Sequence, residues 1–142
     1  MPAYDPFDEL FAAAVRESAG IDLTPPRSVA DNAAKGLALR QKFGRGGTEI
    51  GVARAEELVA RTRLDPSVVK RMVSFFARHE VDKRARNFGN EANPSAGYVA
   101  WLLWGGDEGR AWALETKRRL SSFPSPPVGE GGRAKRSDGE VG

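Results

Sequence analysis

The side chains best suited to chemistry fall in residues 66–80, where basic and hydroxyl groups recur at helical spacing. A helical wheel separates this stretch into an apolar face and a polar face without acidic groups. The polar face consists of Ser67, Lys70, Arg71, Ser74 and Arg78. In a DNA-binding helix, arginine on such a face can form hydrogen bonds with guanine, and lysine can bind phosphate. The pattern also fits an amphipathic helix whose basic face is only solvated.

This helix would be the second of a pair. Residues 52–76 predict two short helices joined by a tight turn, as a helix-turn-helix requires. The segment ELVARTRLDPSVVKR, residues 57–71, resembles the generic bacterial helix-turn-helix pattern. Arg63 stands where that pattern usually has glycine, at a cost of about 1 kcal/mol if the position needs a positive φ. Tandem helices with this spacing also occur in bundles that bind no nucleic acid.

Basic residues on either side of the helix enlarge the candidate nucleic-acid-binding surface. Arg45 lies in a glycine-rich loop whose backbone N–H groups could face a phosphate. Arg63 lies in the turn, and Lys83 and Arg84 follow the second helix. Each of these residues alone is explained by a solvated surface charge. Together with the basic helix face they predict a stripe that holds an anionic partner such as DNA.

Catalytic and metal chemistry find little support in the composition. The chain has no Cys and one His, which excludes disulfides, thiolate metal sites, cysteine nucleophiles and His-rich zinc sites. His79 precedes two nearby acidic residues, but the wheel places it on the apolar face. A hydrogen-bonded core histidine is therefore favoured over a catalytic one. The GRGG loop lacks the flanking strand and lysine of a nucleotide site. We expect a non-enzymatic protein without catalytic residues, metal or cofactor.

Periodicity predicts an all-α fold, a compact bundle of five to six short helices. No segment alternates apolar and polar residues for long enough to be a convincing strand. Glycine, proline and capping residues predict helices at 5–20, 28–43, 48–62, 66–80, 95–104 and 107–120, with a polar loop at 82–94. The expected N-caps are Ser28, Asp65, Ser95 and Asp107, and the third helix is expected to start at Thr48 or Glu49.

Residues 94–112 contain all three tryptophans of the chain, together with Tyr98. Their simplest role is in the core and its rim, with Gly105 and Gly106 folding the last helix back on the one before it. Indole N–H and phenol O–H groups need partners, so some of these rings should lie at the boundary. The alternative is a protein-binding surface, for which such residues are the usual anchors.

Charge and composition divide the chain into three parts. These are an acidic leader helix and linker at 1–27, the helical domain at 28–120, and a tail at 121–142 whose Ser, Pro and Gly content predicts disorder. Residues 1–34 carry a net charge of −4, and residues 35–90 carry +7. The tail's own basic cluster gives it an alternative role in touching nucleic acid. Without a signal-peptide pattern or a long apolar run, a cytosolic protein with no membrane partner is expected.

Three motifs resemble a small domain that recurs in phage and prophage proteins. They are GLALRQKFGRGGTEIGVARA, RMVSFFARHEVDK and PSAGYVAWLLWGGDEGRAWA, within residues 32–116. The resemblance implies a phage origin, with the protein in the cytoplasm of a bacterial host or in the phage particle. It transfers no catalytic residue. It is compatible with DNA binding through the helix-turn-helix-like pair, and also with a structural or protein-interaction module that contacts phage structural proteins during head assembly.

Overall fold

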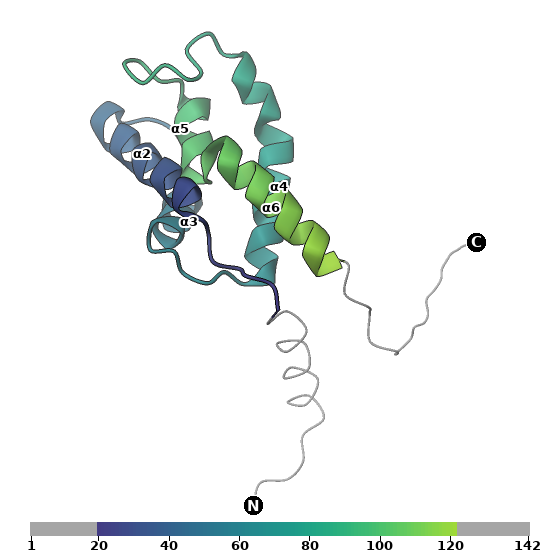
Figure 1. The fold of residues 1–142 in the computed structure, drawn as a ribbon. Coiled ribbons are helices and arrows are strands. Elements are labelled where there is room, and N and C mark those ends of the chain that lie inside the picture. Colours follow the sequence, from purple (N-terminus) through teal and green to yellow (C-terminus); the bar gives the residue numbers. More distant parts are fainter. Residues whose placement is uncertain (1–19, 122–142) are drawn as a thin grey trace, which may run out of the picture.

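The computed structural model describes residues 20–121, which form one packed helical unit (Figure 1). Within that range there are five α-helices, one 3₁₀ segment and no strand, so the expected all-α class is confirmed. The elements are α2 (Arg27–Phe43), α3 (Glu49–Val59), α4 (Pro66–His79), η1 (Glu80–Arg84), α5 (Ala96–Leu103) and α6 (Gly106–Ser121). The expected leader helix up to residue 19 and the expected tail after Ser121 lie outside the described residues.

Helix α5 forms the centre of the bundle. Its sequence, AGYVAWLL, is apolar or small on every side, and Val99, Trp101 and Leu103 are almost fully buried. The large apolar side chains of such a helix have to be covered by neighbouring elements. Helices α2, α3, α4 and α6 all pack against it, and Figure 1 shows α5 between α2 and α4. Tyr98 and Trp112 are partly buried, so the aromatic block forms core and rim as expected.

Helices α2 and α5 approach closely because α2 carries a glycine at their contact. Gly36 is buried, and a Cβ atom there would lie 2.8 Å from the backbone nitrogen of Leu103 and 3.0 Å from the carbonyl carbon of Leu102. Backbone atoms in a packed interior cannot turn aside as a flexible side chain can. Glycine weakens an isolated helix, but the close packing of α2 on α5 requires it at position 36.

The segment before α2 belongs to the core, which corrects the expected linker. Ile21, Leu23 and Pro25 are buried. The backbone N–H of Leu64 donates to the Leu23 carbonyl at 3.0 Å, and Arg61 Nε donates to the Pro25 carbonyl at 2.8 Å. Alternate residues of this short segment are buried, so helical periodicity could not reveal its role. The packed domain thus begins near residue 21 rather than at residue 28.

Two expected N-caps, Asp65 and Ser95, are confirmed, and Thr48 caps the helix that the sequence predicts to start at Thr48 or Glu49. The side chains of Thr48, Asp65 and Ser95 each accept a hydrogen bond from a backbone N–H in the first turn of the following helix. These bonds satisfy N–H groups that have no partner within the helix. They determine where α3, α4 and α5 begin.

Two expected N-caps are wrong. Helix α2 begins at Arg27, so Ser28 lies inside it, because the Pro26 carbonyl already accepts hydrogen bonds from two N–H groups of the first turn. Helix α6 begins at Gly106, whose positive φ of 69° lets the chain turn directly into the helix. Asp107 therefore lies in the first turn of α6 rather than before it.

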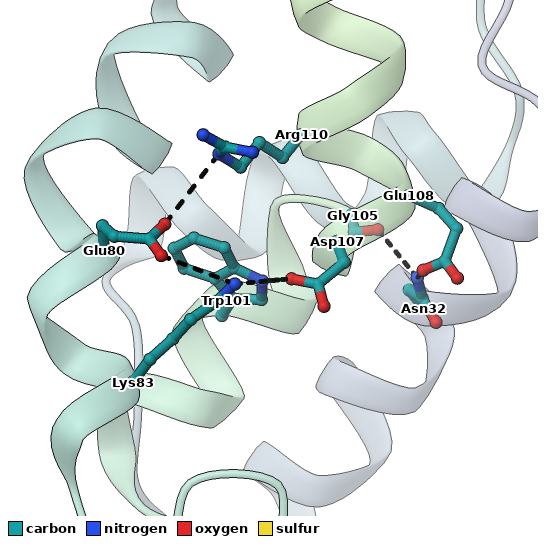
Figure 2. A network of polar contacts seen from close by, with 8 residues as sticks. All are labelled: Asn32, Glu80, Lys83, Trp101, Gly105, Asp107, Glu108 and Arg110. Carbon is teal, nitrogen blue, oxygen red and sulfur yellow. Dashed lines mark hydrogen bonds and ion pairs between the residues drawn. The ribbon is translucent and has the colours of Figure 1, made fainter.

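Asp107 instead joins α5, α6 and η1 in a polar network (Figure 2). Trp101 Nε1 donates to Asp107 Oδ1 at 2.9 Å, and Lys83 Nζ lies 3.1 Å from the same oxygen. Lys83 Nζ also lies 4.6 Å from the ring centroid of Trp101. From α2, Asn32 donates to the Gly105 carbonyl at 2.9 Å. The network gives the buried indole its hydrogen-bond partner and neutralises a basic residue.

Replacing Gly36 with alanine is expected to destabilise the protein although alanine is the better helix former. The gain in helix propensity is about 1 kcal/mol. A methyl group forced against the α5 backbone costs roughly 1–3 kcal/mol, and the immobile neighbour favours the upper end. Urea denaturation should show a lower free energy of unfolding. Ala34→Gly, at an exposed position of the same helix, is the control and should lose about 1 kcal/mol from propensity alone. A Gly36→Ala protein that is more stable than the wild type would contradict the packing.

Candidate binding groove along α4

A groove with a volume of about 910 Å³ runs along helix α4. Its α4 wall is formed by Lys70, Arg71, Ser74 and Arg78, which are four of the five residues expected on the basic face. All four are exposed. We refer to this hollow as the α4 groove. The structure places the predicted polar face along a concave surface, which the sequence alone did not indicate.

The floor of the α4 groove contains a stack of planar side chains. The Phe75 ring lies 4.3 Å from that of His79 and 4.6 Å from that of Trp104, measured between centroids, with interplanar angles of 26° and 9°. Behind Trp104, the guanidinium of Arg54 lies 5.3 Å from the indole centroid. Phe75 and Trp104 are buried, whereas the His79 side chain is 38% exposed. The floor is therefore a fixed apolar surface with one accessible ring.

The remaining lining comes from α5, from residues 47–50 at and before the start of α3, and from Asp82 of η1. Ala96, Gly97 and Ala100 present little side-chain volume to the groove. Gly97 has no room for a larger residue, because a Cβ atom there would lie 2.7 Å from the Cβ of Asp82. Ile50 is 65% exposed and also lines the groove. The α4 groove thus combines an apolar floor with a basic wall.

The cations of the basic wall form no close ion pair within residues 20–121. Lys70, Arg71 and Arg78 form no ion pair with any acidic side chain in that range. Asp82, the one acidic residue that lines the groove, accepts or shares a hydrogen bond with His79 instead. Arg71 does act electrostatically on the Asp65 carboxylate and helps to lower its pKa. Three positive charges therefore line one cavity without a close ion pair in that range. Unpaired cations around a concave, partly apolar surface attract anionic ligands more strongly than cations on a flat surface.

The other expected nucleic-acid-binding residues lie outside the groove. Arg45 donates to the Pro94 carbonyl at 2.8 Å, and Lys83 pairs with Asp107, so both have structural roles. Arg63 is exposed in the connection before α4, and Arg84 is exposed at the end of η1. Ser67 is exposed in the first turn of α4. The stripe expected from the sequence is thus reduced to the cations of the α4 wall.

The α3–α4 pair is more open than a helix-turn-helix with a tight turn. Residues 60–65 join the helices, whereas the motif uses a turn of three to four residues. Helix α3 packs chiefly against α2, and α4 packs chiefly against α6. The positive φ of the connection, 53°, occurs at Arg61. The strain considered for Arg63 therefore does not arise, because its φ is not positive.

His79 corrects the expectation of a core histidine. Its Nδ1 lies 3.0 Å from Asp82 Oδ2, so the expected hydrogen bond is present, but the side chain is 38% exposed. Helix α4 ends at His79 and the chain continues into η1, so the last turn of the apolar face reaches the groove rather than the core. Among residues 20–121, no nucleophile is hydrogen-bonded to the other ring nitrogen of His79.

Sequence reasoning missed the floor of the groove. Phe75, on the apolar face of α4, and Trp104, in the aromatic block, are both buried, yet each also lines the hollow. The signal that could have revealed it is the trio Ala96, Gly97 and Ala100, whose small side chains share one side of an otherwise bulky helix. Small residues on a core helix leave space that a neighbouring helix does not fill.

No cluster of His, Asp or Glu side chains within the described residues is arranged to hold a metal ion. In the same range, no helix combines the length and the apolar character that crossing a membrane requires. The chain matches no protein-family model, no curated protein and no solved structure. The α4 groove is therefore the basis for a functional assignment.

The N-cap that positions α4 also makes stability depend on pH. The Ser67 backbone N–H donates to the Asp65 carboxylate at 2.8 Å and lowers the pKa of Asp65 below its usual value. A carboxyl group whose folded-state pKa is lowered contributes stability that is complete above its unfolded-state pKa. That contribution is lost as the pH falls through the folded-state pKa.

We expect Asp65→Ala to lower the free energy of unfolding at neutral pH by about 1 kcal/mol, because the cap is lost. Asp65→Asn keeps a capping oxygen that does not titrate. Between about pH 5 and pH 2 the wild type should therefore lose more stability than Asp65→Asn. Urea denaturation at both pH values measures the two losses. Equal losses would show that Asp65 does not contribute in this way.

Proposed function

We propose that the protein is a non-enzymatic module that binds nucleic acid at the α4 groove. The observation that carries the proposal is the basic wall, in which Lys70, Arg71 and Arg78 have no ion-pair partner among residues 20–121. Phosphate groups bind such cations with release of counterions, and this supplies most of the affinity in non-specific complexes. Ser74 adds a hydroxyl group on the same wall.

The apolar floor favours a nucleic acid with accessible bases over a regular duplex. The polar face of α4 borders a hollow, whereas a recognition helix protrudes into the major groove. Proteins that hold single strands combine a basic groove with rings on which bases stack. The His79 ring, partly exposed at the end of the Phe75 stack, is the group that a base would reach. The strand would then contact the α4 wall through its phosphates.

The cellular setting is part of the same proposal and rests on the three motifs in residues 32–116. Their resemblance to a phage and prophage domain supports a phage-derived protein that acts in the cytoplasm of a bacterial host or in the phage particle. Both settings expose a binding module to phage DNA.

Fluorescence anisotropy with labelled single-stranded and duplex DNA tests the proposal. With three phosphate contacts, raising the salt from about 50 to 200 mM should weaken binding roughly 20- to 40-fold, because counterion release scales with the number of contacts. Lys70→Glu/Arg71→Glu should weaken binding at least tenfold at low salt. Lys42→Glu/Lys117→Glu changes the net charge equally at exposed positions outside the groove, and it should bind within about threefold of the wild type.

Two outcomes would reject this function. One is the absence of binding to any DNA at low salt. The other is an equal effect of the two double variants, which would assign the affinity to net charge instead of the groove. Tighter binding of the duplex than of the single strand would keep the basic wall as the site but reject base stacking on the floor.

A protein partner is the second candidate, and the exposure of Ile50 favours it. This side chain is 65% exposed beside the apolar floor, and protein partners bury such groups whereas phosphates do not. The module would then bind an acidic segment of a phage structural protein. Ile50→Asp should abolish such a complex, measured by size-exclusion chromatography with purified head proteins, and leave DNA affinity within about twofold. Loss of DNA affinity alone would reject this candidate.

A further inference from the structure

The indole N–H of Trp104 is a hydrogen-bond donor that has no acceptor in the described part of the chain. Trp101 Nε1 donates to Asp107 at 2.9 Å (Figure 2), whereas Trp104 Nε1 forms no hydrogen bond within residues 20–121, although Trp104 is only 8% exposed. In that range, Arg54 Nε is the one fully buried side-chain nitrogen or oxygen without a hydrogen bond, so Trp104 Nε1 is not sealed from solvent. Since Trp104 lines the α4 groove, its N–H opens into the groove.

The first turn of α3 borders this indole nitrogen. A Cβ atom on Gly51 would lie 3.4 Å from Trp104 Nε1 and 4.0 Å from Thr48 Oγ1, so the nitrogen lies close to the start of the helix. Thr48 and Ile50 also line the groove. The Trp104 N–H and the beginning of α3 therefore face the same part of the hollow, which we call the Trp104 end of the groove.

The start of α3 supplies further donors. The N–H groups of Gly51 and Val52 donate to the side chain and the carbonyl of Thr48, respectively. The N–H groups of Glu49 and Ile50 have no acceptor within the helix and form no hydrogen bond elsewhere in residues 20–121. The Thr48 hydroxyl accepts one bond and keeps its own O–H to donate. N–H groups at the start of a helix, next to an indole N–H without an acceptor, suit an anion.

Lys70 and Arg71 bring positive charge to the same end of the groove. Phe75 stacks on Trp104 just after α5, whereas Asp82 lies against the first turn of α5, so α4 and η1 run in the direction opposite to α5. Lys70 and Arg71 precede Phe75 by about one helical turn. They therefore lie toward the Trp104 end, and the carboxylate of Asp82 lies toward the other end.

We propose that the Trp104 end of the α4 groove is a binding site for a phosphate group, either free or esterified. The phosphate oxygens accept from the Trp104 N–H, from the Thr48 hydroxyl and from the N–H groups of the first turn of α3. The α4 wall contributes the charge of Lys70 and Arg71. Donors from several elements favour phosphate over a carboxylate, because phosphate presents more acceptor oxygens in more directions. The site does not rest on nucleic-acid binding, since DNA is one source of phosphate and a small phosphate compound is another.

An NMR titration of the full-length protein with inorganic phosphate tests the site. The three tryptophans give three indole N–H signals, which Trp101→Phe, Trp104→Phe and Trp112→Phe assign. At constant ionic strength, we expect phosphate to move the Trp104 signal downfield in a saturable way, because its N–H gains a charged acceptor. The Trp101 signal is the internal control and should stay in place, because its N–H is already bonded to Asp107.

Trp104→Phe keeps an aromatic ring against Phe75 and removes the N–H donor. Phosphate affinity, measured from the backbone amide signals of Glu49 and Ile50, should fall roughly tenfold, as expected for the loss of one hydrogen bond to a charged group. Trp112→Phe removes an indole N–H that does not line the groove, and its phosphate affinity should equal that of the wild type.

A matched pair of variants at position 49 tests the α3 donors. Glu49→Pro removes one of the N–H groups without an acceptor, and proline fits the first position of a helix. Thr48 has the extended backbone that a following proline favours. Glu49→Ala removes the same acidic side chain and keeps the N–H. We expect Glu49→Pro to bind phosphate at least about threefold more weakly than Glu49→Ala. Thermal melting confirms that each variant is folded.

The phosphate site is overturned if neither inorganic phosphate nor single-stranded DNA moves the Trp104 signal, or if the Trp101 signal moves equally. A response to DNA alone supports the site for a phosphodiester. A response to inorganic phosphate alone supports the site while the proposed DNA binding fails.

Two further results would count against the proposal. A larger response to acetate than to phosphate at the same ionic strength would overturn phosphate as the ligand and assign the site to a carboxylate, as an acidic protein segment supplies. Equal phosphate affinities of Glu49→Pro and Glu49→Ala would reject the start of α3 as part of the site.

Discussion

The burial of α5 is the constraint on which the rest of the structure depends. This helix of eight residues is apolar all round, and its tryptophan, leucine and valine side chains must be removed from water on every side. Helix α2 meets the requirement through Gly36, which lets two backbones approach closely. Residues 21–25 and the connection before α4 also pack into this core, and a backbone hydrogen bond joins them. The single polar atom of Trp101 is satisfied from outside, by Asp107 on α6 (Figure 2).

Helix α4 is divided between this core and the groove. Met72 and Phe76 are buried in the core, and the α4–α6 contact is among the most extensive in the bundle. Lys70 and Arg71 lie on the other side, along the hollow. Phe75 belongs to both, because its ring is buried against Trp104 and still forms part of the floor. The helix is held by its core face, so the backbone positions that carry these cations are fixed relative to the floor of the groove.

The features that depend on local sequence could be predicted, and those that depend on distant contacts could not. Helix type, most helix ends and the caps of Asp65 and Ser95 follow from nearby residues, as does the basic face of α4. The inward packing of Leu23 and the neutralisation of Lys83 by Asp107 depend on partners more than 20 residues away. The groove depends on which elements pack against α5, and its local signal is limited to the small residues of that helix. The small side chains of α5 leave the space of the groove, whereas periodicity indicated only that this helix lies in the core.

The small residues of α5 have a consequence for how this domain can change. Asp82 leaves no room for a side chain at position 97, but Ala96 and Ala100 border open space on the groove side. A larger apolar residue at either position would bury more surface and add stability, while it would shallow the groove. Stability and the depth of the groove are therefore set by the same two side chains. Substitutions at these two positions could change the size of the groove, with the helical frame unchanged.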